Sequence, residues 1–293
     1  MASWRYGFAI GLLWLVVTEY SFASCLHFAD EAALQARKAY WLKEIQQLSS
    51  QQQMAWLIGV SKPLSAAAKE SEQQRDCLLT AARQAVSTTV RLPAQLTYSG
   101  YRDFNHQKTI WTRKYLFQGN AFNRISPQAH QACPDLLQAD ESLWQPGNAR
   151  HRQCWSNHLT PDQRQMEILQ ASSAPGTSRH HWGSDFDLFD PNMNPDHWQV
   201  GKPLFTVYQW MQANARQYGL FQPYKAVSYP GSRAYIEERW HWSYYPVAQA
   251  LLTVLKQQPE AVEQALIQHW GDPSRFSYIK KYWRDFVLNV DEK

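Results

Sequence analysis

The order of hydrophobic patterns along the chain is the feature that most limits its fold. Helical spacing of apolar residues covers 28–48, 64–86, 161–171, 203–217, 246–257, 260–270 and 277–289. Between these ranges, strand-like stretches occur at 90–100, 186–191, 224–230 and 234–242. Strands and helices do not alternate regularly. We therefore predict an α+β fold, with a small, mostly antiparallel sheet and flanking helices.

A helical N-terminal segment is predicted at residues 24–88, ahead of a larger domain at 89–293. Leu34, Trp41 and Ile45 fall on one helical stripe, and Asp30 is suited to start that helix. A hairpin turn is expected either at the polar SSQQQ of 49–53 or at Gly59. No chemical motif occurs in this segment, which suggests a role in packing or in docking an unknown protein partner.

The first residues, MASWRYGFAIGLLWLVVTEYSFASC, have the plan of a secretory signal peptide. Arg5 precedes an apolar run at 8–17, and small residues follow. We predict a signal peptide at 1–23 and an exported protein of the periplasm or cell envelope. The alternative is a lipoprotein acylated at Cys25, although Phe22 is unusual at such a site. No later apolar run is long enough to cross a membrane.

The number of cysteines and the net charge narrow the class of protein further. Cys25, Cys77, Cys133 and Cys154 are an even set in an exported chain, which favours disulfides over free thiols. We pair Cys25 with Cys77 and Cys133 with Cys154, the second pair closing a loop insertion around 133–154. The net charge of +4 is too small and too scattered to indicate binding to nucleic acid.

Two short stretches carry residues suited to a metal. In SRHHWGSDFDL, residues 178–188, His180 and Asp187 are seven positions apart. In ERWHW, residues 238–242, Glu238 precedes His241 by three. A catalytic zinc needs three such ligands, an open position, and a nearby base that takes a proton from water. A single histidine more often has a structural role than a metal-binding one. The two stretches taken together therefore indicate a metal site more strongly than either stretch alone.

These motifs resemble the VanY-type D-alanyl-D-alanine carboxypeptidases. The pattern of that family is Ser-x-His-x-x-Gly-x-Ala-x-Asp followed by Glu-x-x-His, with Ser-Gly-Tyr-Arg upstream. The upstream element is present here as SGYRDFNHQ, residues 99–107. The resemblance covers about 90–250 and implies one Zn²⁺ ion held by His180, Asp187 and His241.

The resemblance also implies the remaining roles. Glu238 would be the general base that activates the metal-bound water, and Arg102 would bind the substrate carboxylate or the developing oxyanion. Ser178 and Gln107 would line the same substrate site. The predicted enzyme is a zinc-dependent carboxypeptidase that removes a C-terminal D-alanine from peptidoglycan stem peptides. Two alternatives stay open: an L,D-carboxypeptidase or cross-bridge endopeptidase, and a zinc-stabilised binding module without activity.

Asp185 departs from the family pattern, which has alanine at that position. In an extended strand Asp185 and Asp187 point to the same side. We predict that Asp185 orients a ligand histidine. His181 would be a ligand only if the register were shifted, which breaks the spacing of the motif.

Overall fold

A small sheet lies at the centre of the computed structural model, which describes residues 25–118, 124–225 and 235–291. Its strands are β1 (Thr97–Ser99), β2 (Asp185–Leu188), β3 (Leu220–Phe221) and β4 (His241–Tyr244). They pair in the order β1-β2-β4-β3, and every pair is antiparallel. The predicted fold class is confirmed.

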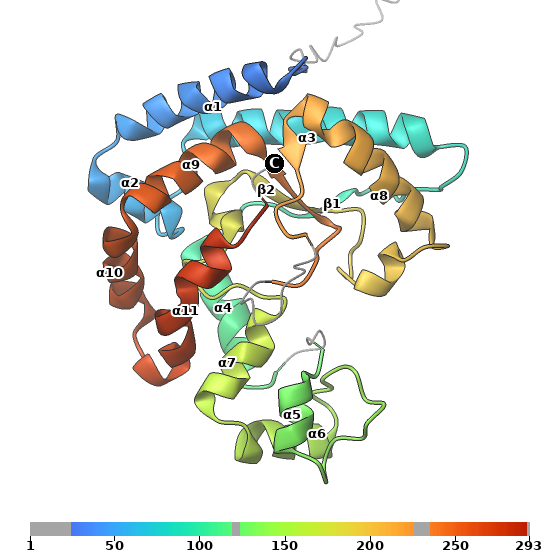
Figure 1. Cartoon of the computed structure of the whole chain (residues 1–293), viewed down its shortest axis with the longest axis vertical. Coiled ribbons are helices and arrows are strands. Elements are labelled where there is room, and N and C mark those ends of the chain that lie inside the picture. The colour runs from blue at the N-terminus through green and yellow to red at the C-terminus, as the bar shows by residue number, and fades with distance from the viewer. Residues whose placement is uncertain (1–24, 119–123, 226–234, 292–293) are drawn as a thin grey trace, which may run out of the picture.

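Helices surround this sheet (Figure 1). They are α1 (Glu31–Gln46), α2 (Ser50–Leu57), α3 (Ser65–Val86), α4 (Phe104–Tyr115), α5 (Pro127–Ala132), α6 (Ala149–Gln153), α7 (Pro161–Leu169), α8 (Pro203–Asn214), α9 (Tyr245–Gln257), α10 (Pro259–Trp270) and α11 (Ser277–Leu288). Short helical turns are η1 (Cys154–His158), η2 (Arg179–Trp182), η3 (Pro195–Trp198), η4 (Ala215–Tyr218) and η5 (Pro273–Arg275). Within the described ranges, no helix combines the length and apolarity that a membrane span requires.

The predicted helices correspond to α1, α3, α7, α8, α9, α10 and α11. Asp30 caps α1, since its side chain accepts a hydrogen bond from the backbone N–H of Ala33 at 2.9 Å. The stripe predicted for α1 is buried at Leu34, Trp41 and Ile45. Apolar periodicity was therefore a sound guide wherever the helix buries an apolar face.

The sequence did not predict four of the helices, α2, α4, α5 and α6, or the strand β3. Of the two places expected for the turn, the polar stretch 49–53 instead begins α2, through a capping box in which Ser49 and Gln52 bond to each other's backbone N–H. The other place is confirmed, since Gly59 lies in the turn that follows α2, with a φ of 77°.

Helices α4, α5 and α6 lie between the strand-like stretch at 90–100 and the helix predicted at 161–171, where no element was predicted. The strand-like stretch at 234–242 is a strand only from His241. Residues 226–230 of the stretch at 224–230 lie outside the described residues, and Tyr224 and Lys225 are not in a strand.

Both predicted disulfides are present. Cys25 bonds to Cys77 in α3, with Cα atoms 6.0 Å apart, and Cys133 bonds to Cys154 with Cα atoms 5.8 Å apart. The second bridge closes the part of the chain that carries α5 and α6, which lies at one end of the molecule, away from the sheet (Figure 1). Its status as an insertion, like the domain boundary at residue 88, stays a prediction.

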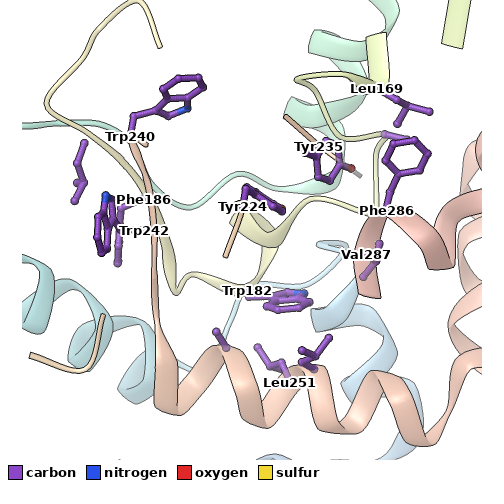
Figure 2. Close-up of a cluster of buried hydrophobic side chains, with 14 of the residues drawn as sticks. Leu169, Trp182, Phe186, Tyr224, Tyr235, Trp240, Trp242, Leu251, Phe286 and Val287 are labelled. Atoms are coloured by element: carbon purple, nitrogen blue, oxygen red, sulfur yellow. The ribbon is translucent and has the colours of Figure 1, made fainter. Parts of the chain in front are cut away.

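The N-terminal helices share their core with the rest of the chain. Helix α1 lies alongside α9 (Figure 1). Figure 2 shows Trp182 of η2 over the helix that carries Leu251, which is α9. The indole N–H of Trp182 donates to the backbone carbonyl of Leu57 in α2, and the indole N–H of Trp56 donates to that of Trp182, each at 3.2 Å. The N-terminal segment thus packs directly against the turn that follows Ser178.

Candidate active site

Strands β2 and β4 bring the end of the motif at 178–188 beside the end of the motif at 238–242. In their register Asp187 is opposite His241, and Asp185 is opposite Ser243. Side chains two residues apart in a strand share a face. Both aspartates consequently reach the ring of His241.

The turn η2 places His180 beside this pair of strands. It ends at Gly183, whose φ of 72° is favoured only for glycine and where a Cβ would meet Pro63 at 2.9 Å. The Nδ1–H of His180 donates to the carbonyl of Gly100 at 2.8 Å. Its Nε2 then lies 3.3 Å from Oδ2 of Asp187, so this nitrogen is the one available to a metal.

One ring nitrogen of His241, Nε2, is hydrogen-bonded to the buried Asp185. Its Nε2 is 3.0 Å from Oδ1 of Asp185, whereas Nδ1 is 3.1 Å from Oδ1 of Asp187 and 3.7 Å from Oε2 of Glu238. Ligand atoms of His180, Asp187 and His241 all lie within 4.8 Å of one another. The three residues predicted as ligands are therefore brought together, with Glu238 beside them.

Glu238 lies in the turn that leads into β4, where the N–H of His241 donates to its carbonyl at 3.2 Å. This turn folds the glutamate back over the histidine. Burial raises the pKa of Glu238 to about 7, and the negative charge of Asp187 adds to that rise. A carboxyl with this pKa can take up and release a proton near neutral pH.

Arg102 connects the candidate metal ligands to the predicted substrate residues. Its guanidinium donates to Oδ2 of Asp187 and to Oε1 of Gln107, each at 3.1 Å. Gln107 in turn donates to the carbonyl of Ser173 at 2.7 Å. Ser178 is buried directly before η2. The Arg102 side chain is 17% exposed against 2% for Asp187, so it lies between the acidic cluster and the surface.

The electrostatics of the cluster favour a cation. Burial would raise the pKa of Asp187, but its interactions with His180, its hydrogen bond with His241 and the charge of Arg102 hold that pKa well below its usual range. Burial lowers the pKa of His180, and the charge of Arg102 adds to this. Despite burial, hydrogen bonds to Asp185 and Asp187 raise the pKa of His241 to about 9. A metal ion and a proton would compete for the same nitrogen of His241.

His181 lies beside this cluster but belongs to the scaffold. Its Nδ1 donates to the carbonyl of Arg102 at 2.6 Å, and its Nε2 accepts from the N–H of Gly176 at 3.0 Å. Burial lowers the pKa of His181 to about 3, so the ring is neutral. Both nitrogens are used by the backbone, which argues against the shifted register.

Sequence reasoning did not single out two residues of this region. Arg179 is 1% exposed. It donates from Nε to Oδ1 of Asp185 at 2.9 Å and from Nη2 to the hydroxyl of Ser243 at 2.6 Å. Lys114 of α4 donates from its ammonium group to the hydroxyl of Ser172 at 2.5 Å, and burial lowers its pKa to about 8, with the positive charge of Arg102 adding to the fall. The one sequence signal for Arg179 is the unexpected Asp185, because a buried carboxylate needs a buried partner. Lys114 gave no signal, since α4 was not predicted.

A cluster of two histidines and a carboxylate, with a buried glutamate beside it on a small antiparallel sheet, is the arrangement of a metallopeptidase. The family model for VanY, described as D-alanyl-D-alanine carboxypeptidase, matches residues 66–247. The chain belongs to this family, which confirms both the resemblance and the predicted class of enzyme. The match begins inside α3 and includes all the predicted site residues.

Individual relatives are more distant. An uncharacterized protein of Haemophilus influenzae is 29% identical over 126 residues, covering 38% of this chain and 90% of that protein. VanYB in complex with D-alanine-D-alanine is 19% identical, covering 66% of this chain and 81% of its own, with a TM-score of 0.33. The LD-carboxypeptidase LdcB is 15% identical, covering 72% and 77%, with a TM-score of 0.35. TM-scores this low add no weight to the family match.

Proposed function

We propose that the chain is a zinc-dependent carboxypeptidase that removes a C-terminal D-alanine from peptidoglycan stem peptides. The observation that carries this proposal is the meeting of His180, Asp187 and His241 with Glu238 beside them. A binding module would need the three ligands but not a buried glutamate whose pKa is raised toward neutrality.

The donor set fits a single zinc ion. Nε2 of His180, Nδ1 of His241 and one carboxylate oxygen of Asp187 would be the ligands, and nitrogen and carboxylate donors in this number suit a catalytic zinc. Zinc supplies Lewis-acid chemistry, which makes water acidic enough to react near neutral pH and polarises a carbonyl group.

Glu238 carries the proton transfer. Its carboxylate takes a proton from the attacking water and later gives it to the departing amine. The pKa of about 7 suits both halves of this task, because the group changes protonation state at small cost. In this protein burial is the main cause of that pKa.

Substrate recognition is assigned to Arg102, with Gln107 and Ser178 beside it. The planar guanidinium can donate two parallel hydrogen bonds to a carboxylate. Gln107 keeps Arg102 in place because its amide bonds to both Arg102 and the carbonyl of Ser173. Asp185 orients His241 by accepting from Nε2, which leaves Nδ1 for the metal.

A peptidoglycan substrate agrees with export. We propose that residues 1–23 are a cleaved signal peptide and that the mature chain acts in the periplasm or cell envelope. These residues lie outside the described part of the chain. The two disulfides suit an oxidising compartment of this kind.

The test is mass spectrometry of purified stem peptides incubated with the mature protein, with and without a chelator. Pentapeptide, tetrapeptide and cross-linked stems are mixed in one reaction. The pentapeptide is expected to lose one alanine in a chelator-sensitive way, and Glu238→Gln is expected to abolish this loss while retaining zinc. Loss of alanine from the tetrapeptide alone would identify an L,D-carboxypeptidase, and splitting of dimers an endopeptidase. No change in any species, with zinc bound, would identify a binding module.

A further inference from the structure

A second network of buried polar groups holds the backbone of Glu238. Gln222 directly follows β3 and is 1% exposed. Its Nε2 donates to the backbone carbonyl of Tyr224 at 3.0 Å and to that of Glu238 at 3.2 Å. The N–H of Glu238 donates to the same carbonyl of Tyr224 at 3.0 Å. Both backbone polar groups of Glu238 are therefore bonded to this short segment of the chain.

The other end of the Gln222 amide is bonded to helix α8. Its Oε1 accepts from the hydroxyl of Tyr208 at 3.0 Å and from Nε2 of Gln212 at 2.8 Å. A glutamine amide has two N–H groups and an oxygen with two lone pairs, so this amide makes all four of its possible hydrogen bonds. A buried polar network that is fully bonded rigidifies its surroundings. Gln222 thereby ties the backbone of Glu238 to α8.

The residues on either side of Glu238 are held through their side chains. Oε1 of Glu237 is 3.3 Å from the hydroxyl of Tyr208. Arg239 forms an ion pair with Glu237 at 3.1 Å, and its guanidinium lies 4.7 Å from the centroid of the Tyr208 ring. Arg239 also donates to the carbonyl of Trp198 in η3 at 2.7 Å. Three consecutive residues, with Glu238 in the middle, are thus fixed by contacts with α8 and η3.

Glu238 needs this support because the sheet does not provide it. Strand β4 begins only at His241, so its pairing with β2 does not include the glutamate. Oε2 of Glu238 nevertheless lies 3.7 Å from Nδ1 of His241, the atom proposed as a metal ligand. A general base must be within hydrogen-bond reach of the proton it takes, and a misplacement of about 1 Å can slow a reaction by about 100-fold. The rate should therefore depend on the contacts that fix the backbone of Glu238.

We propose that Gln222 is a positioning residue for the reaction: its amide holds Glu238 where the carboxylate can take a proton from the attacking water. In this role Gln222 acts through the backbone of Glu238 and not on the substrate. Tyr208 supports it by bonding to the oxygen of the amide. The inference rests on the proposed function for the role of Glu238. It adds two residues that lie outside the three sequence motifs.

The experiment compares steady-state hydrolysis of the stem pentapeptide by variants of the mature protein and by the wild type. Gln222→Met keeps the length of the side chain but removes all four hydrogen bonds. Its kcat is expected to fall about tenfold to 100-fold, while its zinc content is unchanged and its KM changes less than about twofold, as for a group that acts on the transition state alone. Tyr208→Phe keeps the ring and removes one hydroxyl, so its kcat should fall about threefold to tenfold, the range for the loss of one hydrogen bond.

Gln165→Met is the matched control. Gln165 is fully buried and well bonded: its Nε2 donates to the hydroxyl of Ser277 at 3.0 Å, and its Oε1 accepts from the N–H of Tyr278 at 3.1 Å. These hydrogen bonds join α7 to α11, not to the segment around Glu238. The variant should be less stable in urea, because buried groups lose their partners, whereas kcat should stay unchanged.

Hydrogen–deuterium exchange of the segment 235–244, followed by mass spectrometry, needs no hydrolysis. Exchange of backbone N–H groups reports local opening of the chain. Gln222→Met should raise the exchange rate of this segment, and Gln165→Met should not.

An unchanged kcat in Gln222→Met would overturn the proposal, and so would a rise in KM alone, which would place Gln222 at the substrate. An equal fall of kcat in Gln165→Met would also overturn it, since the effect would then come from general destabilisation. If Gln222→Met does not fold, Tyr208→Phe decides by the same measurements. If the wild type hydrolyses no stem peptide, the proposed function fails and exchange decides this inference: faster exchange confined to 235–244 supports it, and unchanged exchange overturns it.

Discussion

The region around Asp187 and the region around Asp185 differ sharply, although the two residues are on one face of the same strand. Asp187 contacts His180, His241 and Arg102, all of which belong to the predicted chemistry. Asp185 is fully buried and accepts hydrogen bonds from Arg179, Ser243, Ser184 and His241.

The difference shows how one strand could provide both a proposed metal ligand, Asp187, and a residue that supports the site, Asp185. Asp185 has its charge neutralised by Arg179, which with the help of His241 lowers its pKa despite burial. Asp187 has two histidines beside it whose remaining nitrogens face the same point. We therefore expect substitutions at Asp187 to act on chemistry first, and substitutions at Asp185 to act on both metal affinity and stability.

Asp187→Asn should have the largest effect. The amide has nearly the same shape as the carboxylate but lacks its charge, so the metal loses a ligand while packing is preserved. Activity should fall more than about 100-fold, which exceeds the usual loss for an outer partner of a ligand. Inductively coupled plasma mass spectrometry of the purified variant should find less zinc per protein than in the wild type. Asp196→Asn, at a side chain that is 69% exposed, is the matched control and should change neither quantity.

Asp185→Ala should have the second-largest effect. It introduces the residue that the family pattern has at this position, removes the acceptor of His241 Nε2 and leaves Arg179 buried without its carboxylate. Zinc affinity should fall about tenfold to 100-fold. The free energy of unfolding of the chelated protein, measured in urea, should fall by about 3–5 kcal/mol, the usual cost of breaking a buried ion pair.

The double variant Arg179→Met with Asp185→Ala separates these two effects. Removing both charges avoids an unpaired buried ion, so most of the stability should return. Zinc affinity should stay low, because His241 still lacks its acceptor. A double variant that regains wild-type zinc affinity would mean that Asp185 supports the site through the fold alone.

The same comparison explains what could be predicted from the sequence. The resemblance to the VanY-type carboxypeptidases predicted His180, Asp187 and His241 as one set, and a short turn followed by a strand keeps His180 and Asp187 in fixed relation. The helices with apolar faces followed from periodicity, and the disulfides from the placement of four cysteines. These features depend on local geometry or on a small number of possible pairings.

The features that were missed depend on contacts between distant parts of the chain. Lys114 meets Ser172 only after α4 has packed, and α4 buries the polar Gln107 among its apolar residues, which obscures its helical pattern. Arg179 reaches Ser243 across 64 residues. Helix α2 begins with glutamines that resemble a polar turn, and only its second half is apolar. No spacing rule specifies these contacts.

His181 gives the smallest expected effect at neutral pH and extends the comparison to two adjacent histidines. Its pKa is about 3 in the folded chain because it is buried, against an ordinary value of 6.5. Between these values the unfolded chain binds a proton that the folded chain does not. The contribution of neutral His181 to stability is therefore complete above about pH 6.5. It is lost as the pH falls from 6.5 toward 3, at up to about 1.4 kcal/mol per pH unit.

The check is the free energy of unfolding of chelated protein at several pH values, compared with His181→Gln. Glutamine offers one donor and one acceptor, for the carbonyl of Arg102 and the N–H of Gly176, but does not titrate. The difference between the two proteins should be flat above pH 6.5 and should shift in favour of the variant below it. His180, Asp187 and His241 titrate in both proteins, so their contributions cancel. A difference that is independent of pH would mean that His181 titrates like an exposed histidine, and would reopen its assignment as a metal ligand.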